Sequence, residues 1–233
     1  MKGILIGDKH TAKDWGLIWT ATRIPYATPK IHTVEIPGHS GVLDFTELMG
    51  GVKYENRKLE FEFTSRDKGI AAWQSLYSEI ANFCHGKVMK IIMDIDAGYY
   101  WTGRVHIDSK KDKPYHGEII MTVDADPYKY SVENSIDEWK WSTFNLRTGI
   151  AKNYNNVAIS GTTTIDILGV KKDEVPIITC SKAMTMLFEG KTYQLASGEN
   201  VNYDIVLKNG TNQMKFTVSG SGTVTILFRG ASL

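Results

Sequence analysis

The sequence predicts a mainly β protein with one helix, built as an N-terminal β-sandwich or split barrel followed by a C-terminal β-sandwich. Three observations carry this prediction. Short runs of alternating apolar and polar residues recur along the chain, as in strands with one buried face. A single stretch has the period of a helix. An irregular segment separates two β-rich regions, which indicates domains at 1–130 and 157–233 with a connector at 131–156.

The N-terminal domain is expected to contain the helix. Residues 58–63 alternate cleanly and predict a strand. From 68 to 84 the apolar residues recur at steps of three and four, which predicts an amphipathic helix. Ser65 or Asp67 can cap its start, and Gly86 stands where a glycine would end it. The apolar stripe consists of Ile70, Trp73, Leu76, Tyr77, Ile80, Ala81 and Cys84.

Three more strands are predicted after the helix. They cover residues 88–95, 99–107 and 117–124, and a polar loop is expected at 110–114. The first of them would place Met89, Ile91, Met93 and Ile95 on one face. The order β-β-α-β-β-β lacks the regular βαβα pattern of a parallel sheet. We therefore expect a mostly antiparallel arrangement with one helix packed against it.

The C-terminal domain is predicted to be all-β, with strands at the short, regular spacing of a sandwich. Asn209-Gly210 and Ser219-Gly220-Ser221-Gly222 are typical hairpin turns. The last two strands are therefore expected to form an antiparallel pair. Apolar residues share one face in each of four predicted strands, at 184–188, 203–207, 214–218 and 224–228.

Composition argues against several classes of protein. The net charge is +1, and neither half carries the basic excess that tight or sequence-specific DNA binding requires. No stretch approaches the roughly 20 consecutive apolar residues of a spanning helix. The apolar run after Lys2 stops at Asp8, too early for a signal peptide. We expect a first strand there, and a protein made and kept in a cytoplasm.

No catalytic or metal-binding pattern stands out, so we expect neither an enzyme nor a cofactor. Cys84 and Cys180 lack a C-x-x-C partner and are interpreted as small buried apolar residues. Asp94 and Asp96 could face a cation, but turn chemistry explains them equally well. Asn209-Gly210-Thr211 fits a glycosylation acceptor and, better, a tight turn. No metal-ligand spacing links the histidines, which are His10, His32, His39, His85, His106 and His116.

Two tryptophans leave an alternative open. Trp139 and Trp141 would share a face if their segment is extended. Exposed indoles of this kind stack on sugar rings, so the alternative function is a soluble carbohydrate-binding or adhesin module. The interpretation we favour is that the two side chains seal the junction between the domains.

One segment is specific to a family. Residues 34–47 read VEIPGHSGVLDFTE, and residues 50–57 read GGVKYENR. Pro37-Gly38 and Gly41 would punctuate a tight reversal between two strands. These stretches resemble the N-terminal domain of siphophage distal tail (Dit) proteins, in which I-P-G-x-x-G-x-L-D-x-T leads into a Y-x-N-R strand. The resemblance covers residues 1–130 well, and the C-terminal part is more weakly similar to the family's galectin-like domain.

The resemblance implies an architectural role. It implies a hexameric ring at the virion tail tip that joins the tail tube to the baseplate and allows DNA passage. The implied partners are further copies, the major tail tube protein, a tail-associated tip protein, and receptor-binding or baseplate proteins. The edges of strands 58–63 and 99–107 are expected to pair or pack across copies. Residues 157–233 contain no His or Trp, so this galectin-like domain is expected to dock proteins and not glycans.

Overall fold

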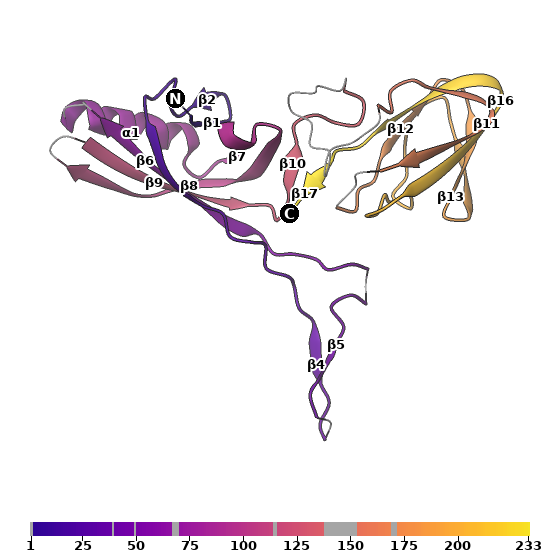
Figure 1. The fold of residues 1–233 in the computed structure, drawn as a ribbon, viewed down its shortest axis with the longest axis horizontal. Helices are drawn as coiled ribbons and strands as arrows, with labels where there is room; N and C mark the ends of the chain where they lie inside the picture. Colours follow the sequence, from indigo (N-terminus) through magenta and orange to yellow (C-terminus); the bar gives the residue numbers. More distant parts are fainter. Residues whose placement is uncertain are drawn as a thin grey trace. The chain divides into compact units, whose positions relative to one another are not determined.

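A computed structural model shows a mainly β chain that divides into two compact units (Figure 1). The first unit is Met1–Lys129, with which Leu233 groups, and the second is Tyr130–Ser232. The residues that the structure describes are 2–38, 40–48, 50–66, 70–113, 116–137, 153–168 and 172–233.

An antiparallel sheet forms the body of the first unit, in the order β2-β1-β7-β8-β9-β6-β3. A separate two-stranded sheet pairs β4 (Thr33–Glu35) with β5 (Val42–Asp44). The 3-10 turn η1 (Asp94–Asp96) follows β7. The strands of the main sheet are β1 (Ile4–Ile6), β2 (Lys9–His10), β3 (Ile18–Arg23), β6 (Arg57–Arg66), β7 (Val88–Met93), β8 (Tyr99–Lys113) and β9 (His116–Ala125).

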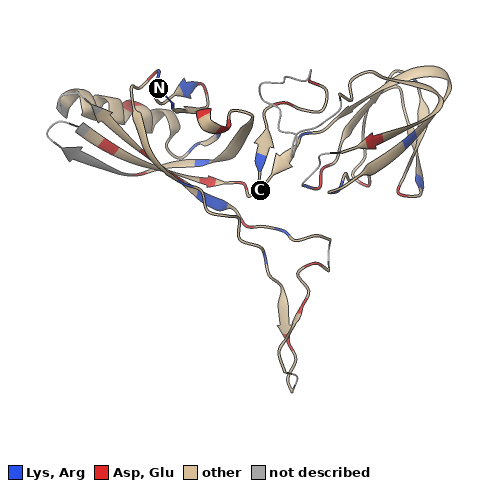
Figure 2. Cartoon of the chain, viewed as in Figure 1, with Lys and Arg blue, Asp and Glu red and all other residues tan. Residues whose placement is uncertain are grey.

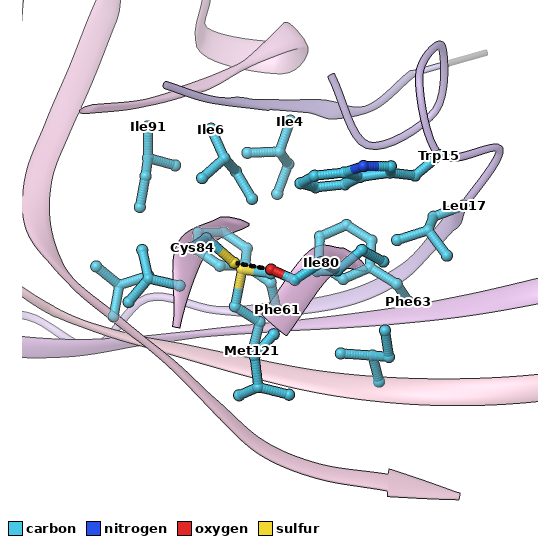
Figure 3. Close-up of a cluster of buried hydrophobic side chains, with 14 of the residues drawn as sticks. Ile4, Ile6, Trp15, Leu17, Phe61, Phe63, Ile80, Cys84, Ile91 and Met121 are labelled. Atoms are coloured by element: carbon cyan, nitrogen blue, oxygen red, sulfur yellow. Dashed lines mark hydrogen bonds between the residues drawn. The ribbon is translucent and has the colours of Figure 1, made fainter. Parts of the chain in front are cut away.

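Helix α1 (Ile70–Cys84) covers one face of this sheet, as the period of its apolar residues predicts (Figure 1). Trp73, Leu76, Ile80 and Cys84 are buried in one core with residues of the strands. Figure 3 shows this core, to which Trp15 and Leu17 of the N-terminal segment also belong. The Cys84 Sγ donates to the Ile80 carbonyl oxygen at 3.1 Å. Gly86 ends the helix with a φ of +77°, as expected.

Two local predictions in this unit are wrong. Ser65 does not cap the helix, because it lies inside β6 and is fully buried, while Asp67 is outside the described residues. Residues 110–113 belong to β8 and not to a polar loop. The register of β8 with β9 shifts between Ile107 and Ser109 and then continues to Lys113, which is opposite His116. Backbone pairing therefore extends the strands beyond the point where the apolar alternation ends.

The second unit has a six-stranded sheet in the order β14-β13-β16-β12-β15, with β11 paired to β16. The apolar faces of these strands form a second core, which includes Met186, Phe216 and Ile226. The short strands β10 and β17 pair with each other. The strands are β10 (Lys129–Ser131), β11 (Val157–Ile167), β12 (Ile177–Cys180), β13 (Met184–Phe188), β14 (Lys191–Leu195), β15 (Gly198–Val201), β16 (Asn212–Leu227) and β17 (Ala231–Ser232).

Strand β16 corrects the predicted hairpin at 219–222. Asn212–Leu227 is one continuous strand. Its register with β11 shifts where Gly161 and Gly220 take φ values of +58° and +81°. The first half of β16 pairs with β13 and the second half with β12, so the strand passes from one part of the sheet to the other. The glycine-rich stretch is a bulge that bends the strand, and not a turn that reverses it.

The predicted strand at 203–207 is also wrong. Only Leu207 in this stretch takes part in a β-bridge, an isolated one to Glu174 outside the strands. Ile205 and Leu207 are buried as expected, but the Tyr203 side chain is 81% exposed. The apolar spacing reflects a loop from which two side chains, those of Ile205 and Leu207, pack into the core. Gly210 has a φ of +112°, in keeping with the predicted turn.

Both ends of the predicted connector 131–156 pack in the second unit. Ser135 is buried, and its Oγ donates to the Ile226 carbonyl oxygen at 2.7 Å. Tyr154 is buried as well, and its hydroxyl donates to the Asp166 carbonyl oxygen at 3.1 Å. Residues 138–152 lie outside the described residues, and Trp139 and Trp141 with them.

Candidate interaction site

The segment 24–56 leaves the main sheet between β3 and β6 and forms an arm (Figure 1). Near the sheet, the outgoing and returning segments of the arm are joined by backbone hydrogen bonds. Lys30 N donates to Lys53 O, and Glu55 N donates to Thr28 O, both at 2.8 Å. Further out, β4 and β5 form the two-stranded tip. We call residues 24–30 and 53–56 the root of the arm and residues 31–52 its tip.

Local sequence explains why the tip is a hairpin. Gly38 and Gly41 have φ values of +83° and +88°, a region that residues with a Cβ rarely enter. The predicted reversal after Pro37 is therefore confirmed. On the far side of the hairpin, Thr46 N donates to Asp44 Oδ1 at 2.8 Å, and His32 N donates to Thr46 Oγ1 at 3.1 Å. The bonds from Thr46 to the carboxylate lower the pKa of Asp44.

The arm exposes large apolar side chains. Tyr26 is 92% exposed, Leu48 is 73% exposed and Ile31 is 65% exposed. A lone two-stranded hairpin is marginally stable in water, and a cluster of exposed apolar residues marks an interaction surface. The tip carries Glu35, Asp44 and Glu47 but no Lys or Arg (Figure 2). The exposed apolar residues of the arm are Ile24, Tyr26, Ile31, Val34, Ile36, Val42, Leu43, Phe45 and Leu48.

Sequence reasoning did not identify this surface. It assigned the reversal at residues 37–41 but not the projection of the whole segment from the sheet. One signal was present in the sequence, namely apolar residues at 24–48 that follow neither the period of a strand nor that of a helix for long. Apolar residues that fit no buried face are candidates for an interface.

Strands 58–63 and 99–107 are not edges, so the expectation that their edges pair across copies is wrong. Strand β6, with residues 58–63, lies between β9 and β3, and β8, with residues 99–107, lies between β7 and β9. The edges of the main sheet are β2 and β3. Strand β2 has two residues, whereas β3 has six and leads directly into the arm. The accessible edge and the apolar arm are therefore continuous.

The face of the sheet opposite α1 carries charges of both signs. On β6, β9 and the part of β8 up to Asp108, the residues that alternate with the core residues point to this face. Arg23 lies opposite Glu60, and Lys90 lies opposite Thr102, so both share this face with Lys58 and Arg104. The carboxylates of the face are Glu60, Glu62, Asp108, Glu118 and Asp124. Among these side chains neither sign is in large excess.

The acidic pair predicted at Asp94 and Asp96 is divided between two structural contacts. Asp94 Oδ2 accepts from Gly3 N at 2.8 Å and lies 3.1 Å from His10 Nε2. Asp96 Oδ2 is 2.6 Å from Lys129 Nζ. In the described part of the chain, no group of three His, Cys, Asp or Glu could hold a metal ion.

His10 is buried beside Asp94, and both of its ring nitrogens are occupied. Its Nδ1 accepts from Ala12 N and Lys13 N at 3.2 Å each, and its Nε2 faces the carboxylate. An imidazole bound in this way has no free lone pair with which to take a proton from a substrate. The pair therefore links the N-terminal hairpin to η1 and is not a catalytic dyad.

Both cysteines are buried and free of disulfides, as expected. Burial raises the pKa of Cys84 to about 11 and also raises the pKa of Cys180. A thiol with a high pKa is a weak nucleophile at neutral pH. No helix in the described ranges is long and apolar enough to cross a membrane.

No protein-family model and no curated protein matches this sequence. Solved structures match along the chain, and one of them shows the class of fold. The Dit protein of phage SPP1, described as a paradigm of the hub adsorption apparatus of phages that infect Gram-positive bacteria, has this fold. Its TM-score is 0.65 at 13% identity, with 100% of both chains covered. The resemblance found in the sequence is thus confirmed as a likeness of fold.

Two structures of the phage p2 baseplate in its activated conformation also match. The one with Sr has a TM-score of 0.41 at 8% identity and covers 98% of each chain. The one with Ca has a TM-score of 0.44 at 8% identity and covers 100% of this chain and 99% of the other. These two likenesses are too weak to support a conclusion.

Proposed function

We propose that this chain is a structural component of a phage or prophage tail tip. In this proposal, copies form a hexameric ring that joins the tail tube to the baseplate and lets DNA pass. The observation that carries the proposal is the fold shared with SPP1 Dit along the full length of both chains. The protein is not an enzyme in this proposal, and its place is the virion tail tip.

The arm is the part of the chain suited to holding copies together. A ring needs a head-to-tail contact between two different surfaces, and the rotation between copies must close. An arm that projects from one side of the sheet can reach a neighbouring copy and bury its apolar residues there. The edge strand β3 leads into the arm, so its free backbone groups are available to the same neighbour.

The charge of the sheet face opposite α1 is compatible with the passage of DNA. A channel for DNA must not retain it, and a face without a basic excess does not hold phosphates tightly. The carboxylates of Glu60, Glu62 and Asp124 offset the cations of this face. In this proposal the face lines the lumen of the ring.

In this proposal the two β-rich parts have different roles. Residues 1–130 form the ring, 131–156 are the connector, and 157–233 form the docking domain. The partners are the major tail tube protein, a tail-associated tip protein, and receptor-binding or baseplate proteins. No glycan binding is assigned to the C-terminal part, because it has neither His nor Trp, and Arg229 is its one arginine.

Sedimentation velocity over an about hundredfold concentration range tests the ring. The wild-type chain is expected to shift from monomer to hexamer as concentration rises, with rings visible in negative stain. The variant Ile31→Glu/Leu48→Glu changes two exposed residues of the arm and should stay monomeric. The matched control Tyr203→Glu changes an exposed apolar residue of the second unit and should assemble like the wild type.

Two outcomes count against the proposal. A wild-type chain that is monomeric at every concentration and forms no rings would contradict it. In that case, binding of the monomer to a glycan array would support the carbohydrate-binding or adhesin module. Assembly that is unaffected by the charged arm variant would show that the arm does not hold the copies together.

A further inference from the structure

We propose that Arg57 is the positioning residue that fixes the direction in which the arm leaves the sheet. Arg57 is the arginine of the YENR stretch and the first residue of β6, where the arm returns to the sheet. Nothing in the proposed ring contact requires this side chain. Its surroundings show what it does.

A single side chain ties together the two strands of the arm. The Arg57 Nη1 donates to the carbonyl oxygen of Pro25 at 3.1 Å. Pro25 lies just beyond Arg23, the last residue of β3, where the outgoing strand has left the sheet. The bond therefore joins the point where the arm leaves to the point where it returns.

The same guanidinium is fixed to the body of the first unit. Its Cζ lies 4.2 Å from the centroid of the Trp101 ring in β8. Arg57 is 5% exposed and Trp101 is 3% exposed, so this contact is made away from water. A guanidinium is planar, and stacking on an indole defines its orientation more sharply than an ammonium group can. Because the same guanidinium donates to Pro25, the stacking also fixes the direction of that hydrogen bond.

The sheet is built to let Arg57 reach Trp101. Arg57 is opposite Ala125 in β9, and Ala125 is opposite Gly103 in β8. Neither of these neighbours has a side chain beyond Cβ. A Cβ at Gly103 would come within 2.7 Å of the Ala125 Cα, so position 103 of β8 has room only for glycine. The long arginine side chain occupies the space that its small neighbours leave.

The site is poorly suited to stabilising the fold, which favours a positional role. Among the described residues no acceptor bonds Arg57 Nε, Arg57 Nη2 or Trp101 Nε1, although all three atoms are buried. Burial also lowers the pKa of Arg57, which reflects the cost of keeping its charge away from water. An apolar side chain of similar length would avoid that cost. What it would lack is the directed bond to Pro25.

A second contact restrains the returning strand. The rings of Tyr54 and Tyr128 meet edge to face, with centroids 5.9 Å apart. This contact involves only the returning strand, whereas Arg57 joins both. We therefore expect the loss of Arg57 to free the direction of the arm while leaving the body of the unit folded.

Pulsed electron spin resonance on the full chain tests this assignment. One nitroxide label is placed at Ser40→Cys in the tip and another at Asp8→Cys in the body. Both native cysteines are buried and do not compete for the label. Labelled protein is diluted with unlabelled protein, so that the measured distance lies within one copy. The readout is therefore independent of whether the proposed ring forms.

Arg57→Met is expected to widen the distance distribution roughly twofold relative to the wild type. Amides of the root should then exchange about tenfold faster. The control Lys58→Met changes the next residue, whose side chain is 67% exposed, and should leave the distribution narrow. Trp101→Leu keeps the Arg57 donor but removes the ring that orients it, and should widen the distribution as well.

A folded Arg57→Met protein with an unchanged, narrow distribution would overturn the assignment. Circular dichroism establishes that each variant is folded before its distances are interpreted. If Arg57→Met does not fold, Arg57→Lys takes its place, because it keeps the charge and loses the planar donor. A narrow distribution for folded Arg57→Lys and Trp101→Leu would overturn the assignment equally.

Discussion

The indole of Trp73 in α1 lies directly against the backbone of Gly117 in β9. A Cβ built at Gly117 would overlap the Trp73 ring, although both residues belong to regular elements. Trp73 is 3% exposed, so the ring has no free space into which to move. The helix sits at its observed height above the sheet because this one strand position has no side chain.

Gly117→Ala is therefore expected to destabilise the first unit by about 1–3 kcal/mol, because an added methyl overpacks a filled core. Chemical denaturation measures the loss. Gly51→Ala is the matched control, since a Cβ there meets nothing within 4 Å, and it should change stability little. Equal stability of the two variants would contradict the close packing of helix and sheet.

Asp94 should make part of the stability depend on pH. Burial by itself would raise the pKa of Asp94. The hydrogen bonds from Gly3 and His10 and the charges of His10 and Lys13 outweigh burial, so the pKa is lowered. A carboxylate whose pKa is lower in the folded state stabilises the fold above its unfolded pKa of about 4. This contribution is lost as the pH falls through the folded pKa.

The wild type should therefore lose more stability than Asp94→Asn between neutral pH and about pH 3. Melting temperatures at several pH values measure the difference. Parallel profiles for the wild type and Asp94→Asn would show that the contact with Gly3 and His10 is not formed in solution.

Ser135 should matter to the second unit out of proportion to its size. Its Oγ donates to Ile226 O and accepts from Phe228 N at 2.8 Å, so it serves two backbone groups at the end of β16. Ser135→Ala leaves both groups buried without a partner, and is expected to cost about 1–3 kcal/mol. Faster amide exchange in β16 would accompany this loss.

Ser197→Ala provides the comparison for Ser135. Its Oγ donates to the Ser181 carbonyl oxygen at 3.2 Å from an exposed position, where water can replace the bond. Its effect on stability should be small. A Ser135→Ala variant that is no less stable than Ser197→Ala would mean that the start of the connector does not pack on β16.

Periodicity alone was enough for the elements whose signal is local. The alternation of Leu59, Phe61 and Phe63 predicted β6, and the steps from Trp73 to Cys84 predicted α1 with its buried stripe. The glycines around Pro37 predicted the reversal, because a positive φ is a property of the residue itself. Each of these features depends on residues close together in the chain.

Features that depend on distant hydrogen-bond partners could not be predicted in this way. The glycines at 219–222 fit a hairpin as well as a bulge, and only the pairing of β16 with β11, β12 and β13 decides between them. The same holds for β6 and β8, whose edges are paired because their neighbours come from elsewhere in the chain. Local pattern does not state which strand lies beside another.

The sequence by itself determined the mainly β class, the single helix and the tight reversal at residues 37–41. It also contained the stretch that resembles distal tail proteins. The tertiary structure decided that residues 24–56 stand away from the sheet as an arm, and that Arg57 is buried at its root against Trp101. The physical reason is that the spacing of apolar residues along a segment tells which face of the element each residue occupies. Whether that face is exposed depends on whether another part of the chain covers it.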